Sequence, residues 1–147
     1  MKRNGFTLIE VLVVSTIIAL LATIGIVSYT AFNKQARDGR RKADMEELRG
    51  ALELYRSNNG VYPSPAGTYG LDFGSGSLTD ASNNTYVSKI PQDPQSPHTY
   101  NYTLVNGDYT LSAELEGSST CGVSGIDCET TGGTQSCNYC LGPYGQK

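Results

Sequence analysis

A long run of apolar positions stands near the start of the chain. Residues Phe6 to Val27 include one charged side chain, Glu10. An α-helix rises about 1.5 Å per residue, so roughly 20 apolar residues cross the hydrocarbon core of a bilayer. The pattern therefore predicts a membrane-spanning helix over residues 6–27. A carboxylate inside such a span is costly unless it is paired, which makes Glu10 a candidate functional residue.

The polar stretch after this run keeps a helical period. Its apolar positions recur every three or four residues, as on one helix face, at Met45, Leu48, Leu52 and Tyr55. No proline interrupts residues 6–58, and Asn58-Asn59-Gly60 is a helix stop signal. We expect one helix of about 50 residues, in which residues 28–60 extend the span. We expect the basic run Arg40–Lys42 on a solvated or intersubunit face, because acidic residues are interleaved with it; a nucleic-acid patch is the alternative.

The pattern changes to strands after residue 60. Thr99–Val105 and Tyr109–Leu115 alternate around Asn106-Gly107, which is the strongest short-range hairpin signal. We expect a two- or three-stranded antiparallel sheet packed on the apolar helix face, with some tyrosines outside. A further short strand is expected at Thr85–Ile90, which Pro91 ends. The polar segment 65–84 is expected to be a loop with a short helical turn at Leu78–Ala81.

Composition and charge narrow the class of protein. The net charge is −3, and residues 59–147 carry two Lys/Arg against eight Asp/Glu. Nonspecific nucleic-acid binding needs a basic surface, and residues 59–147 are acidic. No specific nucleic-acid partner is expected either. Lys2 and Arg3 precede the apolar run and should stay cytoplasmic, which sends the C-terminal part across the membrane. A cleaved signal peptide is the alternative, but no A-x-A-like site follows the run.

The N-terminal residues resemble a known leader. Residues 2–14, KRNGFTLIEVLVV, are similar to the leader region of type IV pilins and type II secretion pseudopilins, and residues 40–63 are similar to the major pseudopilin. The resemblance implies cleavage after Gly5 by prepilin peptidase and N-methylation of the new N-terminus, Phe6. It also implies that Glu10 is the family's characteristic acid, at the fifth position of the mature chain.

The resemblance implies an α+β, pilin-like fold. Its parts are a leader (1–5), a transmembrane and filament-core helix (6–27), an amphipathic extension (28–60) and an extracytoplasmic β head with a disulfide-bonded tail (61–147). The expected protein is a single-pass protein of the inner or cytoplasmic membrane. After assembly it forms a periplasmic or cell-surface filament, and the sequence leaves open whether this is a pilus or a pseudopilus.

Physical chemistry gives Glu10 a role in assembly. Cleavage would leave a charged amine on Phe6, and opposite charges attract strongly in a low-dielectric setting. The Phe6 amine of a neighbouring subunit is the expected partner of Glu10, so that the pair sets the register of a filament. Expected partners are identical or related subunits, prepilin peptidase, an inner-membrane assembly platform and lipid. The alternative is a membrane-anchored extracytoplasmic binding module that does not polymerise.

The four cysteines lie in a polar tail rich in Gly, Ser and Thr. Cys121, Cys128, Cys137 and Cys140 allow three disulfide pairings, and the sequence does not choose among them. A zinc site or a redox CxxC pair is also conceivable. Disulfides persist outside the cytoplasm, and Gly142-Pro143 leaves no room for the helix that a redox motif needs. We therefore expect structural disulfides.

Cofactor and enzyme signals are weak. The resemblance implies a calcium site, for which Asp93 and Asp108 are the candidate ligands. The family's calcium-loop ending is missing here. Ca²⁺ takes about six to eight oxygen ligands, and solvated surface carboxylates are the competing interpretation. The only histidine, His98, is expected to be an exposed loop residue. We expect no other cofactor and no enzymatic activity.

Overall fold

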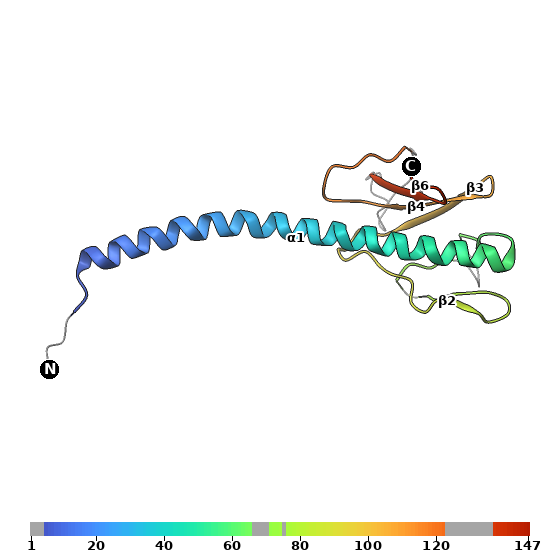
Figure 1. The fold of residues 1–147 in the computed structure, drawn as a ribbon, viewed down its shortest axis with the longest axis horizontal. Coiled ribbons are helices and arrows are strands. Elements are labelled where there is room, and N and C mark those ends of the chain that lie inside the picture. The colour runs from blue at the N-terminus through green and yellow to red at the C-terminus, as the bar shows by residue number, and fades with distance from the viewer. Residues whose placement is uncertain (1–4, 66–70, 75, 123–136) are drawn as a thin grey trace. The chain divides into compact units, whose positions relative to one another are not determined.

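A computed structural model describes residues 5–65, 71–74, 76–122 and 137–147. The chain divides into two compact units, Met1–Ala36 and Arg37–Lys147, which we describe separately. Helix α1 spans Leu8–Asn59 and has 52 residues (Figure 1). The prediction of one helix of this length, accompanied by small antiparallel sheets, is confirmed.

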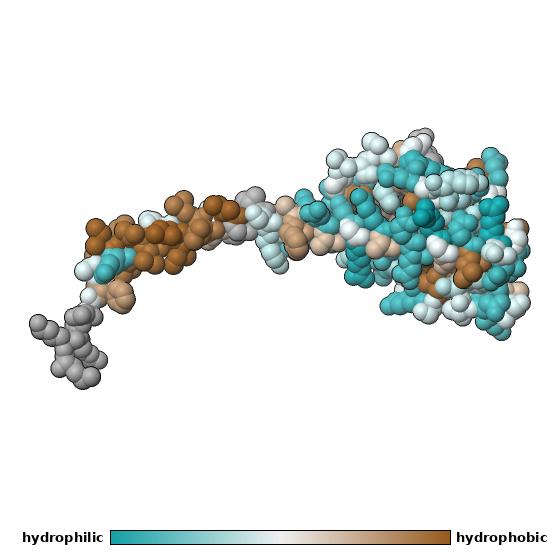
Figure 2. Space-filling view, in the orientation of Figure 1, coloured by the Kyte–Doolittle hydropathy of each residue, from teal (hydrophilic) through white to brown (hydrophobic). Residues whose placement is uncertain are grey.

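The N-terminal unit is an apolar helix without a covering layer. Its most apolar window has a mean hydropathy of 2.6, and within the described part of the chain none of it is buried (Figure 2). The hydroxyls of Ser15, Thr16 and Thr23 donate to the carbonyl three residues earlier, at 2.8–2.9 Å. Because these hydroxyls bond within the helix, they can enter hydrocarbon without an outside partner. Length and composition are those of a membrane-spanning helix.

Helix α1 ends at its predicted stop signal. Gly60 has φ +77° and its N–H donates to the carbonyl of Arg56 at 2.7 Å. A left-handed residue after a helix is usually glycine, because it has no Cβ to clash. The side-chain amide of Asn59 also donates to the carbonyl of Tyr55. The contact from Gly60 satisfies the carbonyl of Arg56, one of the four that the helix leaves open at its end.

The larger sheet has four antiparallel strands in the order β3-β4-β5-β6. Strands β3 (Asn101–Val105) and β4 (Asp108–Ala113) form the predicted hairpin. Asn106 and Gly107 have φ of 54° and 85°, as a two-residue type I′ turn requires. Strands β5 (Tyr139–Gly142) and β6 (Gly145–Gln146) come from the cysteine tail. The predicted count of two or three strands was too low, because the tail continues this sheet instead of lying outside it.

A smaller sheet pairs β1 (Leu78–Thr79) with β2 (Thr85–Val87). The predicted helical turn at Leu78–Ala81 is wrong. Asp80 accepts hydrogen bonds from the N–H groups of Ser82 and Asn84 at 2.8 and 2.9 Å. This side chain satisfies the turn backbone locally, as Asx turns do, so the segment forms a tight hairpin instead.

The core of the head lies between α1 and the sheets. The helix face predicted from the spacing is confirmed, since its four residues are at most 8% exposed. Most tyrosines of the head lie inside rather than outside, at Tyr55, Tyr62, Tyr100, Tyr102, Tyr109 and Tyr139. A buried phenol needs a hydrogen-bond partner, and Tyr100, for example, donates to Asp44 at 2.7 Å. Burial and this carboxylate raise the pKa of Tyr100.

Candidate assembly site

A capping box closes the N-terminus of α1. The backbone N–H and the hydroxyl of Thr7 both donate to Oε2 of Glu10, each at 2.8 Å. The N–H of Glu10 donates in return to the hydroxyl of Thr7 at 3.3 Å. This reciprocal pattern satisfies two donors that a helix N-terminus leaves open. The sequence reasoning missed Thr7, although the T-x-x-E spacing ahead of an apolar run was a signal for it.

Glu10 keeps one carboxylate oxygen open. Among the described residues, no hydrogen bond reaches its Oε1. The side chain stands beside a hollow of about 400 Å³ whose remaining walls come from Phe6, Val11, Val14, Ser15 and Ile18. The capping box therefore fixes the carboxylate next to an apolar groove, with Oε1 available to a cation from another molecule.

The predicted processing residues lie just before the helix. Gly5 and Phe6 precede α1, and Phe6 is 89% exposed. A Cβ placed on Gly5 would meet nothing within 4 Å. Gly5 and Phe6, the two residues on either side of the predicted cut, are therefore accessible.

A buried ion cluster fixes α1 in the head. Arg41 is fully buried and donates to both carboxylate oxygens of Asp93, at 2.8 and 2.9 Å. It also donates to Asp38 at 2.9 Å and to Glu116 at 3.3 Å. Arg37 binds the same Glu116 through two nitrogens. The expectation that Arg40–Lys42 lies on a solvated or intersubunit face is thus wrong for Arg41.

The cluster shifts the pKa values of its members. Burial alone would lower the pKa of Arg41, but hydrogen bonds to Asp93, and further ones to Asp38 and Glu116, raise it instead. The hydrogen bond from Arg37 is the main cause that lowers the pKa of Glu116, to about 2. Charge-assisted, two-nitrogen contacts of this kind hold helix and loops in one arrangement. The period of apolar residues contains no signal for such a cluster.

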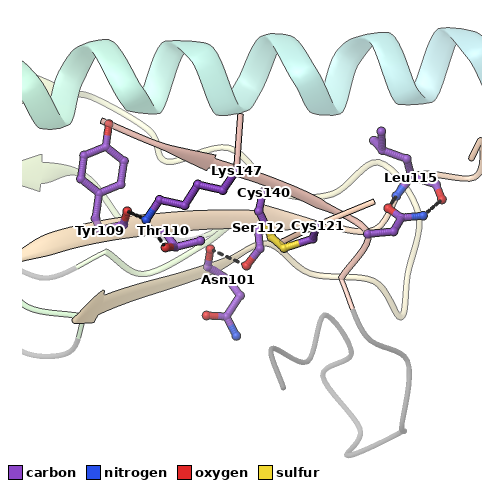
Figure 3. Close-up of a disulfide and its surroundings, with 9 residues drawn as sticks. Asn101, Tyr109, Thr110, Ser112, Leu115, Cys121, Cys140 and Lys147 are labelled. Carbon is purple, nitrogen blue, oxygen red and sulfur yellow. Dashed lines mark hydrogen bonds between the residues drawn. A yellow bond between two sulfur atoms is a disulfide. The ribbon is translucent and has the colours of Figure 1, made fainter. Parts of the chain in front are cut away.

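The cysteine tail is anchored at several points. Cys121 and Cys140 form a disulfide that joins the segment after β4 to β5 (Figure 3). The side chain of Asn138 bonds the backbone N–H and C=O of Leu115 at 2.6 and 2.8 Å. The prediction of a disulfide in the tail is confirmed, and it removes Cys121 and Cys140 as thiol ligands for zinc. Of the other two predicted cysteines, Cys137 is buried and disulfide-bonded, whereas Cys128 lies outside the described residues.

The two candidate calcium ligands lie next to contacts that α1 makes at different points along its length. Asp93 is bound to Arg41, while Asp108 precedes Tyr109, whose hydroxyl reaches Glu53 at 3.1 Å. Arg41 and Glu53 are twelve residues apart on α1, which corresponds to about 18 Å. No group of three or more potential metal-ligating side chains occurs in the described part of the chain. Calcium binding stays a prediction.

His98 is less exposed than expected. Its Nδ1 lies 2.9 Å from Oε2 of Glu114, and the two side chains are 17% and 14% exposed. The prediction of an exposed loop residue is therefore wrong. The loop after Asp93 folds back toward the end of β4, which shields the imidazole.

The fold and the site define a class of protein. A long helix with an uncovered apolar half, a capped glutamate at its start and a small antiparallel sheet on its polar half are the arrangement of pilin-like proteins. Residues 1–26 match the prokaryotic N-terminal methylation motif, and residues 29–121 match type II secretion system (T2SS) protein G. The chain belongs to the type II secretion system protein G family.

Relatives support this assignment over most of the chain. The chain is 30% identical over 128 residues to a type II secretion system core protein G of Vibrio cholerae, covering 77% of this chain and 82% of the relative. Proteins of the same name from Pseudomonas aeruginosa and Escherichia coli K12 are 29% and 30% identical. They align with 75% and 71% of this chain, and with 81% and 73% of their own lengths. The comparison with solved structures gave no significant match.

Proposed function

We propose that the chain is a structural subunit of the pseudopilus filament of a type II secretion system. The observation that carries this proposal is the N-terminal unit, an uncovered apolar helix whose Glu10 leaves one carboxylate oxygen open beside an apolar hollow. Apolar packing alone does not fix how far two parallel helices slide along each other. A buried charge pair does fix it, because an unpaired buried charge is strongly destabilising.

Processing supplies the partner charge. In this proposal prepilin peptidase cuts after Gly5, and the new amine on Phe6 of one subunit meets Oε1 of Glu10 in the next. Thr7 holds Oε2 in the same subunit, so the carboxylate is aimed before assembly begins. The protein contributes no catalytic step.

Before assembly, the subunits reside in the inner membrane. Lys2 and Arg3 keep the N-terminus cytoplasmic, and the apolar half of α1 spans the inner membrane. The head then lies on the extracytoplasmic side, where its disulfide persists. An inner-membrane assembly platform moves subunits from lipid into the filament, in which helix–helix contacts replace lipid contacts.

Glu10→Leu tests the proposal. This substitution removes the carboxylate and keeps an apolar side chain of similar size, so insertion and cleavage should continue while filaments disappear. The matched control is Ser15→Ala, which changes the same hollow but removes only a hydroxyl that bonds to its own helix. The assay overproduces each variant with the secretion genes of its host and images sheared filaments by electron microscopy.

Two outcomes would overturn the proposal. Normal filaments from the Glu10→Leu variant would show that the carboxylate does not set the register. A wild-type chain that inserts into the membrane and stays monomeric at every expression level would be a membrane-anchored binding module instead.

A further inference from the structure

Strand β3 is an outer strand of the larger sheet. Val105 and Asp108 flank the two-residue turn and face each other, and hydrogen-bonded pairs alternate along such a ladder. The backbone N–H and C=O of Leu104 therefore point away from β4. No described residue hydrogen-bonds to them. An open strand edge of this kind can pair with another extended chain.

A hollow of about 300 Å³ lies at this edge of the sheet. Its wall on the α1 side is Gly60, Val61 and Tyr62, and its wall on the hairpin side is Leu104 and Gly107. A Cβ placed on either glycine would meet nothing within 4 Å. Absence of side chains at these two positions leaves the hollow open. Its volume is at the lower end of the range for ligand pockets and accommodates a single apolar side chain.

Arg56 brings a positive charge to this hollow. Its guanidinium lies 4.8 Å from the ring centroid of Tyr62 and donates to that hydroxyl at 2.9 Å. Among the described residues, no other group accepts a hydrogen bond from Arg56. The acid nearest in sequence to the hairpin wall, Asp108, alternates with the buried Tyr109 and so faces the other side of the sheet. Glu53 accepts a hydrogen bond at 3.0 Å from the same Tyr62 hydroxyl and adds to the raised pKa of Arg56. Arg56 thus reaches this acid through Tyr62, with no direct contact to a carboxylate among the described residues. The hollow therefore combines apolar walls with a cation that has no direct carboxylate contact.

Exposed apolar side chains surround the same end of the head. Val61 and Val105 are 65% and 64% exposed, and Tyr144 is 90% exposed. The pKa of Arg56 is raised chiefly by its hydrogen bond to Tyr62, and further by the nearby Glu53 and Tyr144. Figure 2 shows apolar residues among polar ones where α1 ends. Tyrosine and arginine next to apolar side chains are typical of protein interaction hot spots.

We propose that this end of the head binds an extended polypeptide segment of a partner protein, which pairs with β3 at Leu104. One apolar side chain of the segment enters the hollow, and a carboxylate next to that side chain binds Arg56. Strand addition gives affinity through backbone hydrogen bonds, while the pocket and the charge give specificity. The inference does not depend on filament assembly, because none of these residues belongs to the N-terminal unit.

A peptide titration tests this proposal. The ¹⁵N-labelled full chain in detergent micelles is titrated with acetyl-Thr-Val-Thr-Val that has a free C-terminal carboxylate, and with the same peptide as its C-terminal amide. The free acid should shift the amide resonances of Val61, Leu104 and Gly107. It should bind about tenfold more tightly than the amide, as a charge-assisted contact of about 1.4 kcal/mol predicts.

Arg56→Gln should reduce binding of the free acid to that of the amide. The matched control is Lys89→Gln, which removes one positive charge from an exposed position outside the hollow and should leave the affinity unchanged. Absence of shifts at a peptide concentration of about 5 mM, at which a Kd of about 1 mM would leave most of the protein bound, would overturn the proposal. Equal affinities of Arg56→Gln and wild type would do the same. So would shifts of these three amides that grow with protein concentration alone, because the occupant would then be a second copy of the chain.

Discussion

Replacing Arg41 with methionine is expected to lower the free energy of unfolding by about 3–5 kcal/mol. Methionine keeps an unbranched apolar stem and a similar helix propensity, so the change removes chiefly the guanidinium with its charge and hydrogen bonds. Asp93 has no exposed side-chain surface, and its two oxygens face the guanidinium at 2.8 and 2.9 Å. Without Arg41 its charge is buried and uncompensated, which is the costly half of a buried ion pair.

The free energy lost in Arg41→Met depends on which of the acids bound to Arg41 can be hydrated after the substitution. Asp38 and Glu116 are 14% and 19% exposed, and Glu116 keeps Arg37, so their losses are smaller. The main cost is that of Asp93. Arg41→Met combined with Asp93→Leu removes both charges and should recover most of the stability, because an apolar pair of similar volume often replaces a buried ion pair without loss.

The neighbouring residue supplies the control. The side chain of Arg40 is 66% exposed and lies 4.0 Å from Asp44, so Arg40→Met should cost about 0–1 kcal/mol. Urea unfolding of the full chain in detergent, followed by near-UV circular dichroism of its ten tyrosines, measures each difference. The reasoning is refuted if Arg41→Met is within about 1 kcal/mol of Arg40→Met, or if the double variant is less stable than the single one.

Three further substitutions and a metal test follow from the structure. The pKa of Glu116 is lowered from 4.5 to about 2, so the stability that its charge contributes is present above pH 4.5 and is lost as the pH falls toward 2. Glu116→Gln should therefore make the melting temperature depend less on pH between pH 4.5 and pH 2. Cys121→Ser should cost about 2–4 kcal/mol in denaturant unfolding, because the bond closes a long loop. Gly107→Ala, at φ +85°, should cost roughly 1–2 kcal/mol. Because Asp93 is already bound to Arg41, we expect equal melting temperatures in calcium and in EDTA. A calcium-dependent rise in the melting temperature would instead support calcium binding.

The sequence predicts the elements that depend on local signals. The period of apolar residues predicts α1 and its buried face, Gly60 predicts its end, and Asn106-Gly107 predicts the hairpin. Each of these features is set by residues close together in the chain, so that spacing alone reveals it. The leader residues identified the family for the same reason.

Features that depend on distant contacts were missed. Arg41 looks like a surface residue among other charges, and only the folded chain brings Asp93 to it, 52 positions away. Strand β5 lies in a polar tail. Its pairing with β4 is favourable because Tyr139 and Leu141 are buried in a core whose other residues come from distant segments of the chain. The turn at Asp80 differs from the predicted helical turn, because a side chain that satisfies its own backbone leaves no periodic pattern in the sequence.

The central claim is that the chain is processed to a mature filament subunit whose N-terminus is Phe6. The most direct measurement is the intact mass and N-terminal sequence of the protein purified from membranes of its own host. The account predicts a chain that starts at Phe6, with or without one added methyl group. A chain that still starts at Met1 would contradict it, because the amine that Glu10 is proposed to bind would not exist.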